Sequence, residues 1–160
     1  MMDRLLSSAV VLLAALGSGV VCGIFYAFSS FVMAALARLP VPQGVAAMNA
    51  INQTVITPSF MLVFLGTSVL CVGVVVSSST WWPHTSGKLA VIGALLYLAG
   101  GLGLTLVGNQ PMNLALAALP ADQAARYWSE YLPQWVALNH ARTAATFAST
   151  VLFVAALALR

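Results

Sequence analysis

Four long apolar segments, separated by shorter polar stretches, dominate the hydrophobic pattern of the chain. They cover residues 5–36, 58–76, 89–108 and 136–159, and none shows the polar–apolar alternation of a strand. A helix needs about 20 apolar residues to cross the hydrocarbon core of a bilayer, which these lengths match. Backbone groups in lipid must be hydrogen-bonded within their own segment, which favours helices. The pattern predicts an all-α fold, an integral membrane four-helix bundle that forms a single domain over residues 1–160.

The third connection, residues 109–135, contains a further helical pattern that begins just after Pro120. Aromatic side chains recur there at helical spacing, at Tyr127, Trp128, Tyr131 and Trp135. Such a stripe suits an amphipathic helix that lies across the mouth of the bundle. We therefore expect a short amphipathic helix in this connection.

The shortage of charge agrees with a membrane location. Only 6% of the 160 residues are charged, whereas a soluble domain carries roughly 25%. Most of the exterior must then face the lipid bilayer. The basic residues are scattered, so we expect no nucleic-acid partner. The first apolar segment is far longer than the apolar region of a signal peptide, and we expect it to remain as a helix.

Residues near the helix ends predict the orientation. Arg4, Lys88 and Arg160 share one side of the predicted bundle, and Arg38 and Arg126 share the other. This small excess favours a cytoplasmic location for both termini. In the second connection, Trp81 and Trp82 are expected to anchor the helices at the membrane interface.

Small residues indicate how the helices pack. Gly19 and Gly23 form a GxxxG pair, and Gly100, Gly101 and Gly103 give the third helix a smooth face. Such faces let helices approach closely in lipid, within one chain or between two copies in a homo-oligomer.

Polar side chains gather at one face of the predicted bundle. The first and third connections must emerge on the same side, because consecutive connections of a hairpin bundle alternate. The start of the fourth helix lies at the same level. The amide, hydroxyl and cationic side chains of this face are Asn49, Asn52, Gln53, Thr54, Asn109, Gln110, Asn113, Asn139, His140, Arg142 and Thr143.

Arg142 is the most informative of these residues, because it lies more than one turn inside the fourth apolar segment. Facing lipid there would cost a few kcal/mol, so the side chain should face the bundle or extend to the headgroups. It belongs to a polar stripe with Asn139, Thr143, Thr146 and Thr150. A comparable stripe on the first helix comprises Cys22, Tyr26, Ser29, Ser30 and Met33. Two interpretations remain: a cavity lined by both stripes, or a helix end anchored in the headgroups.

No metal site is predicted. His84 and His140 fall on opposite faces, and three acidic residues offer too few ligands for a closed zinc site or a two-histidine, one-carboxylate site. The CxxCH motif of covalent haem attachment is absent from the sequence, although haem bound through one histidine stays open. There is also no nucleotide-binding fingerprint and no GxSxG motif.

Several motifs together resemble the anthrone-oxygenase-like family of small membrane proteins. They are GIFYAFSSFVM at 23–33, AMNAIN at 47–52, NQPMN at 109–113, and the pattern that joins Trp128 and Trp135 to NHART at 139–143. Three positions depart from the usual family pattern, namely Ala34, Asn49 and Thr57. They affect the first connection more than the fold.

The resemblance implies a membrane oxidoreductase that uses dioxygen to convert an apolar phenolic, anthrone-like substrate into a quinone, without an organic cofactor. On that hypothesis His140 is the general base, and Arg142 stabilises the enolate oxygen together with Asn109, Asn113 and Asn139. Trp128 and Trp135 would stack on the substrate rings. Tyr26, Asn52 and Thr143 complete the expected binding residues.

Two alternatives belong to other classes. The first is a non-catalytic membrane module that binds a small apolar ligand or a partner membrane protein. The second is a transporter, which the lack of an inverted repeat and of acidic residues within the spans disfavours.

Overall fold

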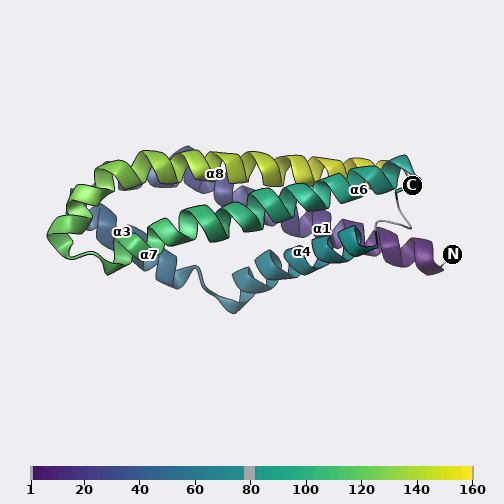
Figure 1. Cartoon of the computed structure of the whole chain (residues 1–160), viewed down its shortest axis with the longest axis horizontal. Helices are drawn as coiled ribbons and strands as arrows, with labels where there is room; N and C mark the ends of the chain where they lie inside the picture. Colours follow the sequence, from purple (N-terminus) through teal and green to yellow (C-terminus); the bar gives the residue numbers. More distant parts are fainter. Residues whose placement is uncertain (1, 78–81, 160) are drawn as a thin grey trace.

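The computed structural model describes residues 2–77 and 82–159, and these form an all-α bundle (Figure 1). Four helices are long and apolar enough to cross a membrane: Ser7–Leu36, Pro58–Val76, Thr85–Ala118 and Ala121–Ala158. They run side by side along the long axis of the molecule. The N-terminal end of the first and the C-terminal end of the last lie at the same end of the bundle. The predicted helical membrane bundle is confirmed.

The first and third long helices each contain π-helical segments. The first comprises α1 (Met2–Ala27), η1 (Phe28–Val32) and α2 (Met33–Leu36) without a break. The third comprises α6 (Thr85–Leu96), η2 (Tyr97–Gly103), η3 (Thr105–Asn109) and α7 (Gln110–Ala118). A π-helical turn is wider than an α-helical turn and often occurs at functional sites. Here residues of all three widened segments, among them Phe28, Leu102 and Thr105, line the cavity described below.

The first connection forms a helix that the sequence pattern did not predict, α3 (Val41–Thr54). Its Asn, Gln and Pro residues suggest a loop, yet Pro42 lies in the first turn, where proline is compatible with a helix. One face buries Gly44 and Met48 against the neighbouring helices. Tertiary packing of that face therefore outweighs the weak local propensity.

The expected amphipathic helix of the third connection is present, but it is not separate. It continues into the fourth span as one helix, α8 (Ala121–Ala158), of 38 residues. Pro133 lies inside this helix and removes one backbone hydrogen bond. The helix nevertheless continues, because Trp128, Tyr131 and Trp135 around the proline are buried against the rest of the bundle.

Two hydrophobic clusters hold the bundle together. The larger one joins α1, α6 and α8 to α4 (Pro58–Val76). The smaller one joins α2, α3, α7 and the first half of α8 around Met48, Trp128 and Tyr131. The polar residues discussed below lie where the two clusters meet.

The glycines contribute unequally to this packing. A Cβ atom on Gly100 would collide with the Cβ of Ala145, and one on Gly101 would lie 3.1 Å from Thr146 Cγ2. Gly100 thus requires glycine for the contact between the third helix and α8, and Gly101 makes a tight contact with the same helix. A Cβ atom on Gly23 would meet nothing within 4 Å, and on Gly19 only Thr150 Cγ2 at 3.7 Å. The GxxxG pair therefore does not mediate close packing within this chain.

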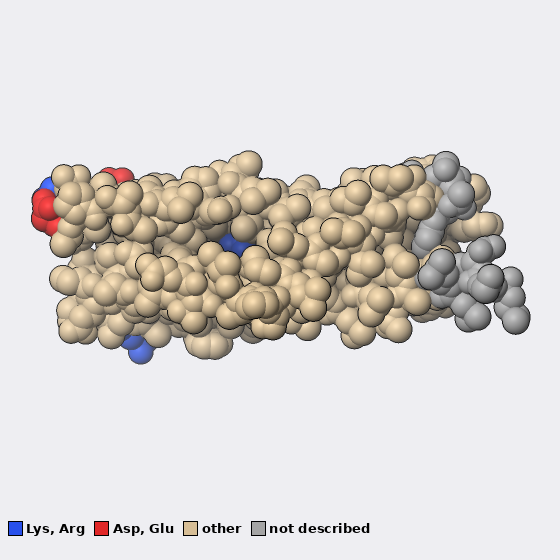
Figure 2. Space-filling view, turned by 90° about the horizontal axis from the view of Figure 1, so that it is seen from below, with Lys and Arg blue, Asp and Glu red and all other residues tan. Residues whose placement is uncertain are grey.

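Charged residues gather toward one end of the molecule in the face shown in Figure 2, and the long side surface is almost wholly uncharged. A single basic side chain is visible inside a hollow at mid-length. Trp82 is half exposed near the opposite end. Trp81 and Arg160, which were expected to lie near helix ends, fall outside the described residues.

Candidate functional site

A cavity of about 310 Å³ lies inside the bundle between α1, α3, α4, the π-helical part of the third helix, and α8. This volume is near the lower limit of small-molecule sites, roughly 300–1,000 Å³. Aromatic rings form much of its wall, from Phe25, Phe28, Phe60, Phe64 and Trp135. Its polar groups come from Asn52, Thr105, Asn109, Gln110, Asn113, Asn139 and Arg142. The cavity therefore combines a largely apolar, aromatic lining with several amide, hydroxyl and guanidinium groups.

Arg142 is buried in this wall, with 7% of its surface exposed. Its guanidinium carbon lies 3.7 Å from the centroid of the Phe25 ring, which is a cation–π contact. Nη1 donates a 3.3 Å hydrogen bond to Asn139 Oδ1, and the buried Nε has no hydrogen-bond partner. The side chain faces the cavity instead of extending along the helix to an interface.

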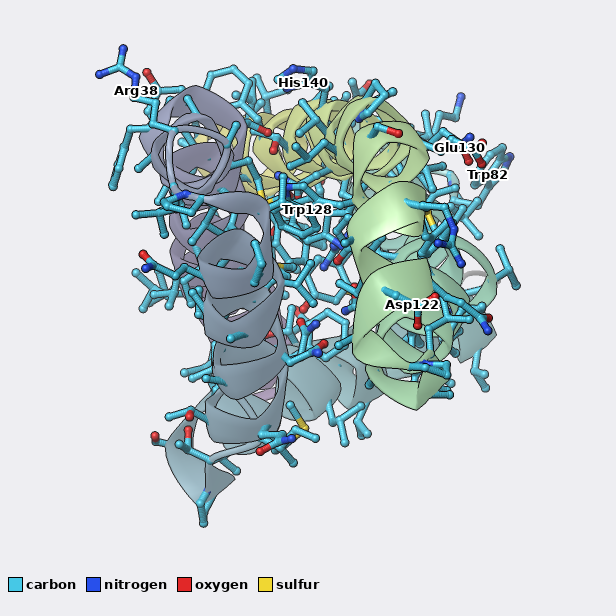
Figure 3. All side chains as sticks on the ribbon, turned by 90° about the vertical axis from the view of Figure 1, so that its left-hand side faces the viewer. Arg38, Trp82, Asp122, Trp128, Glu130 and His140 are labelled. Carbon is cyan, nitrogen blue, oxygen red and sulfur yellow. The ribbon has the colours of Figure 1, made fainter. Side chains whose placement is uncertain are left out.

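No acidic side chain among the described residues lines the cavity. Asp122 forms an exposed ion pair with Arg126 at 2.8 Å, and Glu130 is exposed. Figure 3 shows Asp122 and Glu130 on the outside of the bundle. Arg142 thus brings a positive charge into an apolar enclosure without a carboxylate to neutralise it.

Asn139 fixes the position of the arginine. Its Nδ2 donates to the backbone carbonyl of Phe25 at 2.7 Å and to Ser29 Oγ at 2.8 Å. Both amide hydrogens are then used, so Oδ1 must face Arg142. Because Asn139 is fully buried, this arrangement holds the guanidinium against one wall.

Trp135 orients two further amides. Its indole Nε1 donates to Asn113 Oδ1 at 2.9 Å, and its backbone carbonyl accepts from Asn109 Nδ2 at 3.1 Å. Tyr131 also donates to Asn113 Oδ1, at 2.7 Å, and Asn113 Nδ2 donates to Asn52 Oδ1 at 3.0 Å. The amides thus form a network that joins α3, the third helix and α8.

Three polar atoms of cavity-lining residues are buried and without a partner: Asn52 Nδ2, Asn109 Oδ1 and Arg142 Nε. Buried polar atoms are nearly always hydrogen-bonded, because an unpaired one costs about 1–3 kcal/mol. Two donors and one acceptor beside this cavity are thus left without a partner from the protein itself.

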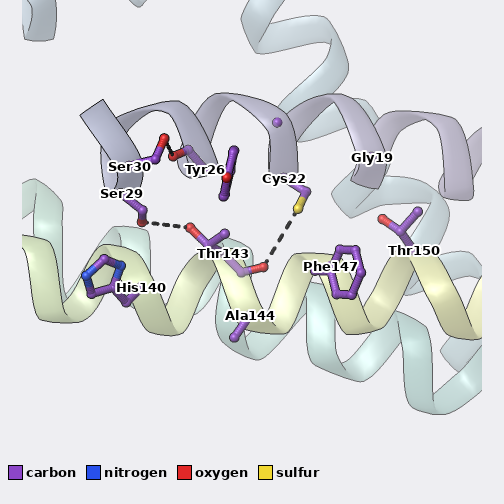
Figure 4. Close-up of a pocket in the computed structure, with 11 residues that line it drawn as sticks. Gly19, Cys22, Tyr26, Ser29, Ser30, His140, Thr143, Ala144, Phe147 and Thr150 are labelled. Carbon is purple, nitrogen blue, oxygen red and sulfur yellow. Dashed lines mark hydrogen bonds between the residues drawn. The ribbon is translucent and has the colours of Figure 1, made fainter. Parts of the chain in front are cut away.

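Six of the ten sequence-predicted site residues line this cavity. They are Arg142, Asn139, Asn109, Asn113, Asn52 and Trp135. Tyr26, Thr143 and His140 lie elsewhere, along a groove between α1 and α8 on the outer surface (Figure 4). Ser29 lines that groove and bonds to Asn139, so it separates the two spaces.

The expected pairing of His140 with Arg142 does not occur. Residues two positions apart in an α-helix point about 200° apart around its axis. Arg142 is buried toward the cavity, and His140 is therefore exposed on the other side of α8. Figure 3 shows His140 on the outside of the bundle, and Figure 4 shows it in the outer groove. A general base must come within about 3 Å of the proton that it removes. From this position His140 cannot reach a substrate bound at Arg142.

Trp128 also lies outside the cavity. Its ring stacks on that of Tyr131, with centroids 5.4 Å apart and planes 13° from parallel, and it is buried in the smaller cluster. Gly44 gives it room, because a Cβ there would lie 3.1 Å from Trp128 Cζ2. The tryptophan expected to stack on a substrate instead packs α8 against α3.

The aromatic wall of the cavity was not predicted from the sequence. Phe25 and Phe28 are three positions apart on the first helix, and Phe60 and Phe64 are four apart on α4. Both spacings place the two rings on one side of a helix, which is the signal that could have identified them. In lipid, however, aromatic residues on a helix are common, and the spacing alone does not distinguish a cavity from a packing face.

The cavity carries no metal-binding set. Nowhere in the described part of the chain do three or more His, Cys, Asp or Glu side chains group together as metal ligands. Cys22 and Cys71 are both free thiols, on α1 and α4.

The fold and the cavity define a multi-span α-helical membrane protein with a polar, cationic wall inside the bundle. The sequence model of the anthrone oxygenase family matches residues 53–152, more than half of the chain, and the protein belongs to that family. The matched region includes Asn109, Asn113, Trp135, Asn139 and Arg142. A search of curated proteins and a search of solved structures returned no match.

Proposed function

We propose that this protein is a membrane-embedded oxygenase that oxidises an anthrone-like substrate, a flat phenolic molecule dissolved in the bilayer, to a quinone with dioxygen. Family membership supports an oxygenase-type activity. The observation that carries the proposal is the buried, carboxylate-free guanidinium of Arg142 in a cavity walled by aromatic rings. A planar substrate whose oxygen becomes negative during the reaction complements both features.

Arg142 would act by stabilising that oxygen. An anthrone has a weakly acidic C–H opposite its carbonyl, and loss of this proton places negative charge on the carbonyl oxygen. A cation in an apolar cavity stabilises such a charge far better than it would in bulk solvent. Arg142 Nε is a free donor for the enolate oxygen, and Asn139 holds the guanidinium in place. The rings of the substrate would pack on Phe28, Phe60 and Phe64.

The proposed chemistry needs only the substrate and dioxygen. The C–H bond breaks, its proton passes to water, and the enolate remains. The enolate carbon supplies electrons to dioxygen and forms a C–O bond, and protonation gives a hydroperoxide. Loss of water from that group breaks the O–O bond and removes the second hydrogen of the same carbon. One oxygen atom is then in the quinone and the other is in water, and the four electrons taken by dioxygen come from the carbon centre.

In this scheme no protein side chain serves as the base, which revises the role first expected for His140. Among the described residues that line the cavity, none carries a carboxylate, imidazole or thiol. The scheme thus requires Arg142 to stabilise the enolate enough, relative to the neutral substrate, that water can accept the proton.

The decisive experiment measures oxygen uptake and quinone formation by the purified protein in lipid nanodiscs with an anthrone. Arg142→Gln should lower kcat by about 10²–10³, the effect of removing one oxyanion donor. The matched control is Arg126→Gln, since Arg126 is an exposed arginine on the same helix, and it should retain full activity. Equal activity of both variants would refute the role of Arg142. Tight binding of quinones without any oxygen uptake would instead favour a non-catalytic ligand-binding module.

We also propose that both ends of the chain face the cytoplasm, which places α3 and the start of α8 on the opposite side. Two observations support this orientation. Basic residues are slightly more frequent on the side of the termini, and the first and last helices have their terminal ends at the same end of the bundle. Protease accessibility of a C-terminal tag in sealed, oriented vesicles would decide it.

A further inference from the structure

The amides of Asn52 and Asn109, two residues that line the cavity, leave one donor and one acceptor unpaired. Asn52 Nδ2 and Asn109 Oδ1 are both buried and unpaired, and both residues line the same cavity as Arg142. In an amide, nitrogen and oxygen can exchange places by a half-turn, so these assignments need a chemical argument. Neighbouring groups with a fixed hydrogen-bonding role supply it.

The orientation of Asn109 follows from a carbonyl. A backbone carbonyl can only accept, and that of Trp135 lies 3.1 Å from the Asn109 amide. Asn109 must therefore turn its Nδ2 toward Trp135. Its Oδ1 is left as a buried acceptor without a hydrogen-bond partner.

The orientation of Asn52 follows from an indole. The Trp135 Nε1–H can only donate, so Asn113 must turn Oδ1 toward it. Asn113 Nδ2 is then directed at Asn52, whose Oδ1 must accept this hydrogen bond, at 3.0 Å. The remaining atom of that amide, Asn52 Nδ2, is left as a free donor. One residue, Trp135, thus sets the polarity of both amides.

We propose that Asn52 and Asn109 are specificity-determining residues that together bind a neutral phenolic hydroxyl of the substrate, apart from the oxygen held by Arg142. A hydroxyl is both donor and acceptor, so one such group placed between the two side chains would satisfy Asn109 Oδ1 and Asn52 Nδ2 at once. An ether oxygen would satisfy only Asn52, and a bare ring carbon would satisfy neither. This inference rests on the proposed function, because it assumes that the cavity holds an anthrone-type ring system.

The predicted consequence is a ranking of substrates. Sites built to hydrogen-bond a hydroxyl reject analogues that lack it, because the buried polar groups are then left unpaired. Among ring-substituted anthrones, at least one hydroxyl isomer should exceed unsubstituted anthrone in kcat/KM by about tenfold or more. The matching methoxy isomer should fall below the hydroxyl isomer.

The experiment compares wild type with Asn52→Leu, Asn109→Leu and the control Gln53→Leu, which changes an exposed neighbour on α3. Asn109→Leu should remove the difference between hydroxyl and methoxy substrates, and Asn52→Leu should lower the preference for either over unsubstituted anthrone. Gln53→Leu should keep the wild-type ranking. If wild type oxidises all the substrates at similar kcat/KM, the inference fails while the proposed function stands.

A binding measurement on the wild-type protein tests the hydroxyl site separately from the oxygenase activity. It does not depend on whether the variants fold. Hydroxylated and unsubstituted anthraquinones are titrated against wild-type protein, with quenching of tryptophan emission as the signal, since Trp135 lines the cavity. The hydroxylated quinone should bind at least about tenfold more tightly. That result without any oxygen uptake would keep the hydroxyl site and refute the oxygenase. Equal affinities for both quinones would overturn the hydroxyl site.

Discussion

Arg142 is held in the apolar bundle by contacts that offset only part of its charge. An arginine near the centre of a membrane helix costs about 2.5–3.5 kcal/mol on insertion scales. The desolvated contact with Phe25 returns about 2 kcal/mol, and the single bond to Asn139 returns a further part. The free Nε remains as a donor that a ligand would satisfy. At Arg142, the Nε–H group that is left unpaired in the folded protein is thus also the group available to bind a ligand.

Two adjacent residues on α8 give a direct test of which side of the helix carries the chemistry. Asn139→Ala removes the acceptor that positions Arg142 and should lower kcat by about tenfold. His140→Ala changes an exposed side chain on the outer groove and should leave kcat within about twofold. Oxygen uptake with an anthrone measures both.

The His140→Ala result distinguishes a catalytic base from a residue outside the site, because a general base typically increases the rate by 10²–10⁴-fold. A hundredfold loss in His140→Ala, with folding intact by circular dichroism, would restore the imidazole as the base. It would also require a substrate position in the outer groove.

Residue chemistry was predictable from the sequence where polar groups are rare. Arg142 and Asn139 were identified because polar side chains in or beside an apolar segment need partners, and Asn109 and Asn113 because their connection emerges at the same face. The direction in which each side chain points around the helix axis was predicted less accurately. His140 and Arg142 were treated as neighbours, although consecutive even positions on a helix diverge by about 200°.

At the scale of the elements, glycine contacts determine how closely the third helix approaches α8. Gly100 lies in the π-helical segment η2, where a Cβ atom would collide with the Cβ of Ala145. Neither methyl group can rotate away, so the backbones would have to separate. Gly101 beside it is less crowded, since a Cβ atom there would lie 3.1 Å from Thr146 Cγ2. This contact lies beside the cavity wall formed by Leu102 and Arg142.

Gly100→Ala should therefore destabilise the protein by about 1–3 kcal/mol, the usual effect of overpacking. Gly66→Ala is the matched control, because a Cβ atom there would meet nothing within 4 Å. Alanine in place of an unhindered helical glycine is expected to be neutral or stabilising by roughly 0.5–1 kcal/mol. Thermal unfolding in detergent, followed by circular dichroism, compares the two variants. A Gly100→Ala protein as stable as Gly66→Ala would contradict the packing described here.

The elements themselves differed in how well the sequence predicted them. The second span was expected at residues 58–76, and α4 is Pro58–Val76, because Thr57 caps the helix and Pro58 follows it. The helix α3 and the continuity of α8 were missed. Both depend on the burial of Met48, Trp128 and Tyr131 in one cluster, a tertiary contact that hydropathy along the chain does not reveal.

At the scale of the whole molecule, the cavity opens on the side of the bundle and not only at its end. Ile56, Leu65 and Leu106 line the cavity and are also exposed, with 47–68% of their surface accessible. Figure 2 shows a hollow at mid-length on the uncharged side surface. In a bilayer that surface faces acyl chains. An apolar substrate could therefore reach Arg142 directly from lipid, without crossing the polar connections.

A bulky residue at this opening should obstruct entry without disturbing Arg142. Leu106→Trp places a larger ring at the rim and should lower kcat/KM for an anthrone supplied in nanodiscs by about tenfold, with kcat less affected because substrate capture is impaired. Val107→Trp is the matched control, since Val107 is the next residue, is 77% exposed and does not line the cavity. Tryptophan on a lipid-facing helix surface is well tolerated, so both variants should fold. If Leu106→Trp and Val107→Trp have the same kcat/KM as wild type, the substrate does not enter between α4 and the third helix, and an entrance beside α3 becomes the alternative to test.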